Sequence, residues 1–229
     1  MFGRKKTVDD PVDEIDEDDQ TEDVDEADEP EEEDERDEWV EFDLSQDWRA
    51  DGPFDIDEVD LSADEIKRID LGAMILTLEK GMTVTLIVTP DKHILSAVVN
   101  NGPNSAVHLT VFAAPSAGDY CATLREDIIA HTENAKVTKK AKGPFGTELR
   151  RVVATKDDKG HEGFAPMRDW LIEGPRWVLD ARLMGQAAIE EHGADAIIFE
   201  EFVRNIIVRR GDEAMVPGSI VPLTPREEK

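Results

Sequence analysis

The sequence predicts an α+β fold in which a mostly antiparallel sheet is flanked by two main helices. Segments with the two-residue alternation of strands follow one another closely between residues 68 and 183, and short connections favour antiparallel pairing. Two further segments carry apolar residues three and four apart, the spacing of helices that pack on a sheet. The chain has 229 residues, which suits one core of roughly 150 to 180 residues.

The first half of the chain predicts a four-stranded meander. The strands are expected at residues 68–78, 82–89, 94–100 and 106–113. Glu79-Lys80-Gly81 indicates one hairpin turn, and Asn101-Gly102 indicates another because both residues tolerate positive φ.

A helix is predicted after these strands. Ser116 is followed three residues later by Asp119, which is the pattern of a capping box. The helix should bury Cys121, Leu124 and Ile128 and end near residue 134.

The second half repeats this order. Strands are expected at residues 137–142, 148–155, 163–172 and 177–183, and Trp177 should face the core. A helix that Asp195 can cap should run to about Arg210 and end at Gly211. Its apolar face consists of Ile198, Phe199, Phe202, Val203, Ile206 and Ile207. The predicted order is four strands, a helix, four strands and a helix, which either one sheet or two would accommodate.

Negative charge is concentrated near the N-terminus. The chain holds 54 Asp+Glu and 26 Lys+Arg, a formal net charge of −28, and residues 1–50 alone hold 24 acidic and 5 basic residues. Residues 1–38 have too few apolar side chains to offset the entropy of ordering. We therefore predict a disordered acidic tail at residues 1–38, an aromatic and acidic segment at 39–51, and a single α+β domain at 52–229.

The composition predicts a cytoplasmic protein. Cys121 is the single cysteine, which excludes an internal disulfide framework and fits a reducing compartment. Because Cys121 lies on an apolar helix stripe, we expect a buried, inert thiol rather than a nucleophile. No apolar run approaches the roughly 18 residues of a membrane span, and acidic residues stand where a secretion signal has its apolar stretch.

Two groups of residues are candidates for binding a partner. Trp39, Phe42 and Trp48 lie in an acidic run and would bind a protein partner; alternatively, they dock on the domain that follows them. The second group is a candidate basic surface formed by Lys136, Lys139, Lys140, Lys142, Arg150, Arg151 and Arg168. A basic sheet with interleaved aromatic residues can hold single-stranded nucleic acid, whereas the simpler interpretation is a solvated sheet face.

The residue types predict no catalytic residue, no cofactor and no metal site. The histidines His93, His108, His131, His161 and His192 are far apart, without the spacing of metal ligands. Phosphate-binding and nucleophile-elbow motifs are also absent from the sequence.

Short motifs in a fixed order resemble an actinobacterial family of uncharacterised proteins, domain of unknown function 3710. They are Gly52-Pro53-Phe54-Asp55, Arg68-Ile69-Asp70-Leu71-Gly72, Phe112-Ala113-Ala114-Pro115, Gly143-Pro144-Phe145-Gly146-Thr147-Glu148-Leu149, Gly174-Pro175-Arg176-Trp177 and Val208-Arg209-Arg210-Gly211-Asp212. The resemblance implies an acidic N-terminal tail but no activity, cofactor or catalytic residue. The order of strands and helices is also similar to the PsbP-like fold, which is an analogy of fold and not of function.

The sequence thus favours a non-enzymatic protein-interaction or scaffold module with an unknown protein partner. One alternative is a weak nucleic-acid-associated protein that its own acidic tail inhibits by covering the basic residues. Another is an enzyme or small-ligand carrier without a recognisable motif.

Overall fold

The computed structural model describes residues 38–116, 118–156 and 159–226. The predicted acidic tail lies outside these residues except for Glu38. The strands are β1 (Phe54–Asp55), β2 (Ile69–Asp70), β3 (Met74–Leu76), β4 (Met82–Val88), β5 (Ile94–Asn101), β6 (Ser105–Ala113), β7 (Ala135–Gly143), β8 (Gly146–Lys156), β9 (Glu162–Gly174), β10 (Trp177–Gly185) and β11 (Ile207–Val208). The helices are α1 (Glu38–Leu44), α2 (Tyr120–Ala130), α3 (Gln186–Ile189) and α4 (Ala194–Arg204), and Ile56–Glu58 form a short 3-10 helix.

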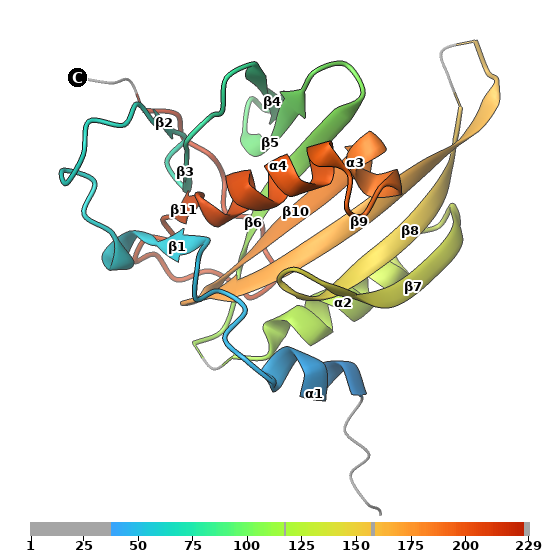
Figure 1. The fold of residues 1–229 in the computed structure, drawn as a ribbon. Coiled ribbons are helices and arrows are strands. Elements are labelled where there is room, and N and C mark those ends of the chain that lie inside the picture. The colour runs from blue at the N-terminus through green and yellow to red at the C-terminus, as the bar shows by residue number, and fades with distance from the viewer. Residues whose placement is uncertain (1–37, 117, 157–158, 227–229) are drawn as a thin grey trace, which may run out of the picture. The chain divides into compact units, whose positions relative to one another are not determined.

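A seven-stranded antiparallel sheet with the order β4-β5-β6-β10-β9-β8-β7 dominates the fold (Figure 1). Successive strands are joined by tight turns such as Asn101-Gly102, where Gly102 has a φ of 66°. The predicted α+β class with mostly antiparallel pairing is confirmed. The sequence was compatible with either one sheet or two, and the described residues form two sheets.

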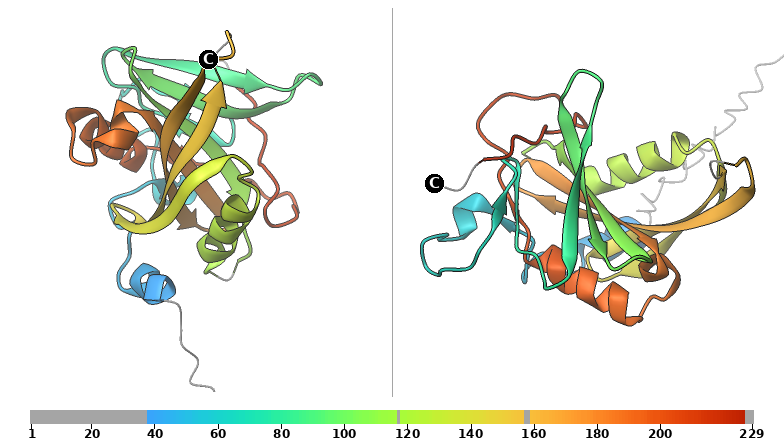
Figure 2. Two further views of the ribbon diagram at one scale, coloured as in Figure 1. Left: turned by 90° about the vertical axis from the view of Figure 1, so that its right-hand side faces the viewer. Right: turned by 90° about the horizontal axis from the view of Figure 1, so that it is seen from above.

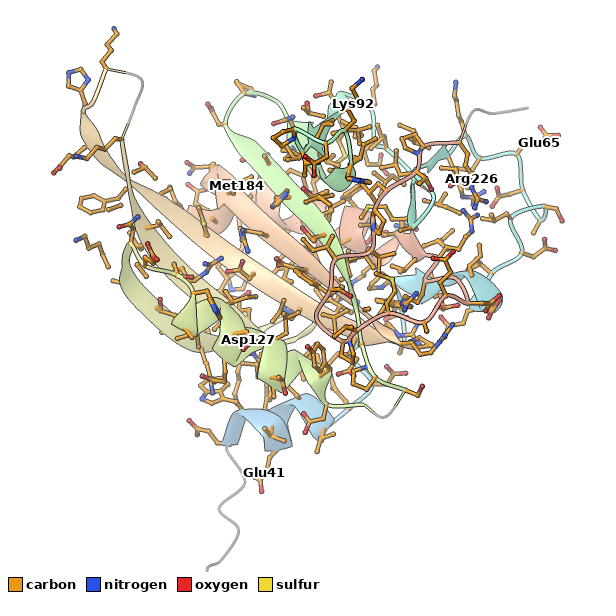
Figure 3. The ribbon with its side chains drawn as sticks, turned by 180° about the vertical axis from the view of Figure 1, so that it is seen from behind. Glu41, Glu65, Lys92, Asp127, Met184 and Arg226 are labelled. Atoms are coloured by element: carbon orange, nitrogen blue, oxygen red, sulfur yellow. The ribbon has the colours of Figure 1, made fainter. Side chains whose placement is uncertain are left out.

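Helices α2 and α4 cover opposite faces of the large sheet (Figure 2). On the α4 side, Trp177, Leu179 and Leu183 of β10 join Phe199 and Phe202 of α4 in the main hydrophobic core. On the other face lies α2, with Asp127 labelled in Figure 3. There a smaller cluster packs Cys121 and Leu124 against Leu171 and Val178. Because side chains alternate between the two faces along β10, this strand contributes residues to both cores. Trp177 is fully buried, as predicted.

A smaller sheet with the order β1-β11-β3-β2 packs at the edge of the main core. The strand predicted at residues 68–78 is instead β2 and β3, which pair with each other and with β11. The reason is that Gly72 adopts a φ of 83° between them, which breaks the run. The predicted four-stranded meander is therefore wrong, and three strands, β4 to β6, form it.

Helix α4 is shorter than the sequence predicted. It begins at Ala194 and ends at Arg204, whereas the prediction extended it to about residue 210. The three residues after Asn205 are Ile206, Ile207 and Val208, and such β-branched residues favour strands. Ile207 and Val208 form β11, parallel to β1.

The C-terminal segment crosses the sheet as an extended chain. Ile220 and Leu223 form isolated bridges to Phe112 and Ile94. Among the described helices, none combines the length and apolar character needed to cross a membrane.

Candidate functional site

The aromatic segment, residues 39–51, packs against the domain beside the start of β8. Asp43 Oδ1 accepts a hydrogen bond from the backbone N–H of Thr147 at 2.6 Å. The hydroxyl of Thr147 in turn donates to the carbonyl of Trp39 at 3.4 Å. The short helix α1, too short to be stable alone, is thus held by contacts with residues more than 100 positions away.

The rings of Phe42 and Trp48 pack on each other, with centroids 4.8 Å apart. Trp48 Nε1 donates to the carbonyl of Asp43 at 3.1 Å, and Lys142 Nζ lies 5.0 Å from the centroid of the Phe42 ring. The structure therefore places Trp39, Phe42 and Trp48 half-buried on their own domain. Their role in binding a partner stays a prediction.

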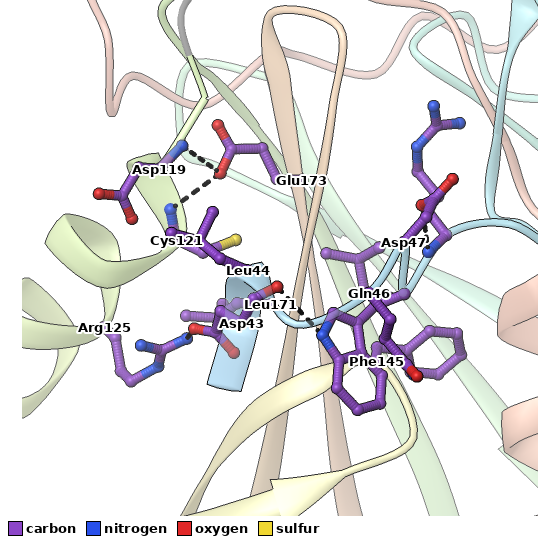
Figure 4. Close-up of a pocket in the computed structure, with 13 residues that line it drawn as sticks. Asp43, Leu44, Gln46, Asp47, Asp119, Cys121, Arg125, Phe145, Leu171 and Glu173 are labelled. Carbon is purple, nitrogen blue, oxygen red and sulfur yellow. Dashed lines mark hydrogen bonds and ion pairs between the residues drawn. The ribbon is translucent and has the colours of Figure 1, made fainter. Parts of the chain in front are cut away.

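Two pockets flank Trp48. The first, which we name the Cys121 pocket, is lined by Asp43, Trp48, Arg49, Cys121, Arg125 and Glu173, among others (Figure 4). The second, the Arg168 pocket, is lined by Phe42, Trp48, Lys142, Arg168, Trp170 and His192, together with residues of α4 and the loop before it. The aromatic segment therefore forms one wall of both pockets.

The N-terminus of α2 lies at the Cys121 pocket and is capped by Glu173 of β9. The carboxylate of Glu173 accepts hydrogen bonds from the backbone N–H groups of Asp119, Tyr120 and Cys121 at 3.0 to 3.3 Å. The capping box predicted from Ser116 is wrong, because α2 begins four residues later at Tyr120 and Asp119 makes no side-chain cap. A carboxylate at this position satisfies orphan N–H groups and complements the helix dipole.

Cys121 is buried and free. Burial raises the pKa of its thiol well above the usual value, and the nearby carboxylate of Glu173 raises it further. The thiol is therefore protonated at neutral pH, and a thiol rather than a thiolate is a poor nucleophile. The burial expected from the sequence is confirmed, and the low reactivity of the thiol stays a prediction.

A fully buried carboxylate, Glu148, holds two residues that line the Arg168 pocket, Arg168 and Trp170. It accepts hydrogen bonds from Arg168 Nη2 at 2.8 Å, from Trp170 Nε1 at 2.7 Å and from Arg150 Nε at 2.6 Å. Arg150 also contacts Glu191 at 2.7 Å. Because burying a charge requires pairing and hydrogen bonds, this network explains how Glu148 and Arg168 are both tolerated inside.

The seven residues of the candidate basic surface do not share one face. Arg150 and Arg151 are neighbours on β8 and point to opposite sides of the sheet, because side chains alternate along a strand. Arg151 and Arg168 are buried in ion pairs. Lys136, Lys139 and Lys142 are exposed on β7, and Lys140 contacts Glu126 of α2 at 3.0 Å.

A second buried charge network lies on the α2 side of the sheet. Asp169 accepts two hydrogen bonds from Arg151, at 2.6 and 2.7 Å, and one from Arg182 at 2.5 Å. Asp180 receives only a 3.2 Å contact from Arg182, and its Oδ1 is buried without a partner among the described residues. Burial, and then the charge of Asp169, raise the pKa of Asp180 to about 7.

His108 borders this network and donates to, or accepts from, Ser96 Oγ at 2.7 Å. Burial, and then the positive charge of Arg182, lower the pKa of His108. The described residues contain no group of three His, Cys, Asp or Glu side chains arranged to hold a metal ion.

The sequence analysis did not identify five buried or half-buried charged residues that organise these sites. A charged residue inside an otherwise apolar strand or helix is the sequence pattern that could have indicated them. These residues are Arg125, Glu148, Asp169, Glu173 and Asp180.

The two edges of the large sheet differ in charge. The edge strand β7 carries Lys136, Lys139, Lys140 and Lys142. The opposite edge strand β4, with the sequence MTVTLIV, has no charged residue. Within the described residues β5 is its neighbour in the sheet on one side, and no strand pairs with the other side.

Comparison with known protein families gives a match over most of the chain. A family model described as protein of unknown function (DUF3710) matches residues 52–229. The chain belongs to this family. The match begins at Gly52, so the DUF3710 region contains both sheets and α2 to α4, whereas α1 and Trp48 precede it. A comparison with curated proteins finds no match.

Proposed function

We propose that this DUF3710 protein is a non-enzymatic protein-interaction module that binds an extended segment of a basic partner protein along β4. The observation that carries the proposal is the contrast between the uncharged edge strand β4 and the lysine-rich edge strand β7.

An edge strand offers unpaired backbone N–H and C=O groups to any extended chain. Proteins commonly protect such edges with lysine, as on β7, and β4 lacks this protection. Its outward side chains Thr83, Thr85 and Ile87 are exposed. In this mode of recognition the backbone supplies affinity and the alternate side chains supply specificity.

The charge of the chain favours a basic partner over a second copy. Each copy carries a formal net charge of −28, so two copies repel each other over the range of the Debye length. The same charge attracts a basic protein and accelerates its encounter.

Site-specific photo-crosslinking in the producing organism tests the proposal. A photoreactive residue replaces Thr85 on β4 or, as the matched control, Lys139 on β7. The proposal expects one basic protein to crosslink from position 85 and not from 139. The double variant Thr83→Lys/Ile87→Lys should abolish the product, whereas Ile197→Lys on the exposed face of α4 should retain it.

The purified partner should then slow amide hydrogen exchange of β4 in the full chain. A crosslinked product that persists in the Thr83→Lys/Ile87→Lys variant would overturn the proposal. So would a product that consists of two copies of this chain.

A further inference from the structure

Arg168 lines the Arg168 pocket, and one of its guanidinium nitrogens is buried and is not satisfied by any group in the part of the chain that the structure describes. Arg168 bonds to Glu148 through Nε, at 3.1 Å, and through Nη2, at 2.8 Å. Its Nη1 is buried and has no hydrogen-bond partner among the described residues. Leaving a buried donor of a charged group unsatisfied is costly, so an acceptor is expected at this position.

The acidic side chains around the pocket are already engaged elsewhere. Glu148 is bound by three donors, Glu191 contacts Arg150 at 2.7 Å, and Glu200 contacts Arg204 at 2.9 Å. At the mouth, the ammonium group of Lys142 lies over the ring of Phe42. Among the charged residues that line the pocket, Lys142 and Arg168 are therefore the ones left to meet a ligand, which favours an anionic ligand.

Three of the residues that line the pocket are Phe42, Trp48 and Trp170, which have large aromatic rings. Phe42 and Trp48 come from the aromatic segment, and Trp170 lies beside Arg168 with its ring centroid 5.4 Å from the guanidinium carbon. The pocket has a volume of about 380 Å³, within the roughly 300–1,000 Å³ that is common for small-molecule sites. Aromatic side chains of this kind pack well on a planar ring.

We propose that the Arg168 pocket binds a small ligand that joins a planar ring to one anionic group. The anion accepts from Arg168 Nη1 and pairs with Lys142, while the ring packs against Trp48. An aromatic carboxylate and a nucleoside monophosphate share this chemistry. The site is independent of β4, which lies at the far edge of the sheet order.

Calorimetric titration of the full chain with benzoate and with uridine 5′-monophosphate tests the proposal and distinguishes the two kinds of anion. Benzamide and uridine are the matched neutral probes. We expect at least one anionic probe to bind at least about tenfold more tightly than its neutral counterpart, a difference typical of one charged contact. The indole N–H resonances of Trp48 and Trp170 should shift on binding, and that of the core residue Trp177 should not.

Three variants distinguish binding in the Arg168 pocket from a general effect of the protein's charge on ligand affinity. Lys142→Met, at an exposed position, should weaken binding roughly three- to tenfold. Arg168→Lys keeps a positive charge beside Glu148 but removes Nη1, and should weaken binding by more than tenfold. Lys139→Met, on the same strand, should leave affinity unchanged.

Three results would overturn the proposal. The first is that neither anionic probe binds saturably at about 10 mM, the weak end of specific affinity. The second is equal affinity for the charged and neutral probes. The third is equal effects of Lys142→Met and Lys139→Met.

Discussion

Asp43 and Arg125 form an ion pair in which Arg125 Nη2 lies 2.7 Å from Asp43 Oδ2. This ion pair joins the aromatic segment to α2 across 82 positions of sequence. The side chain of Arg125 is 2% exposed. The other oxygen of Asp43 accepts the N–H of Thr147 at 2.6 Å. One carboxylate thus holds α1, α2 and β8 together, and the aromatic segment belongs to the folded unit although the family match begins at residue 52.

Replacing this carboxylate should destabilise the fold. Asp43→Ala leaves the buried Arg125 without its ion-pair partner and with the carbonyl of Thr147, 3.3 Å from Nη2, as an acceptor. We expect a loss of about 2–4 kcal/mol in the free energy of unfolding. Asp47→Ala is the matched control, because Asp47 is exposed and its carboxylate, among the described residues, accepts the backbone N–H of Arg49 and no other hydrogen bond. Its effect should stay within about 0.5 kcal/mol. Urea unfolding measures both, and equal losses would show that the ion pair adds nothing.

Glu173 should stabilise α2 through its charge as well as its hydrogen bonds. Glu173→Gln keeps an acceptor near the backbone N–H groups of Tyr120 and Cys121 but removes the negative charge at the helix N-terminus. We expect a loss of about 1 kcal/mol that shrinks at high salt. Glu133→Gln, at an exposed position just beyond α2, is the control. Urea unfolding at low and high salt would contradict this account if Glu173→Gln were as stable as Glu133→Gln.

Cys121 should react slowly with thiol reagents in the native protein. Burial blocks access, and the raised pKa of the thiol keeps it protonated. We expect labelling by a chromogenic disulfide at pH 8 to be at least about a hundredfold slower than in urea-unfolded protein, because it requires local opening. Asp43→Ala should accelerate labelling in native buffer, since Asp43 lines the same pocket. Fast labelling of the native wild-type chain would show that the thiol is accessible.

Local patterns predicted the strands of the large sheet and the character of its core. The residues 82–89, 94–100 and 106–113 correspond to β4, β5 and β6 because alternation and turn residues act over a few positions. The small sheet was not predictable in this way. Its two-residue strands β1 and β11 carry no periodic signal, and they pair across about 150 positions in the register Phe54↔Ile207.

The candidate site was predicted only in part. Aromatic content singled out Phe42 and Trp48, and charge singled out Lys142 and Arg168; all four line the Arg168 pocket. The buried partner of Arg168 was missed, because Glu148 belongs to another strand and no local rule links them. Alternation along β8 was sufficient to place Arg150 and Arg151 on opposite faces, which argues against a single basic surface.

The carboxyl group of Asp180 should make stability depend on pH in an unusual direction. Its pKa is raised from 3.8 to about 7 in the folded chain, so between these values the folded state binds more protons than the unfolded state. Stability therefore falls as pH rises through this window, by about 4 kcal/mol at most. The charged groups that face Asp180 are Asp169, Arg182 and Arg151 from β9, β10 and β8.

Asp180→Asn removes this titration while keeping the size of the side chain. We expect the variant to be more stable than the wild type at pH 8, and the difference to shrink as pH falls toward 5, because wild-type Asp180 becomes neutral. Urea unfolding from pH 5 to pH 8 measures the difference. Asp91→Asn, at an exposed turn position, should show no such trend. A difference between Asp180→Asn and wild type that is constant across this range would mean that Asp180 does not titrate there.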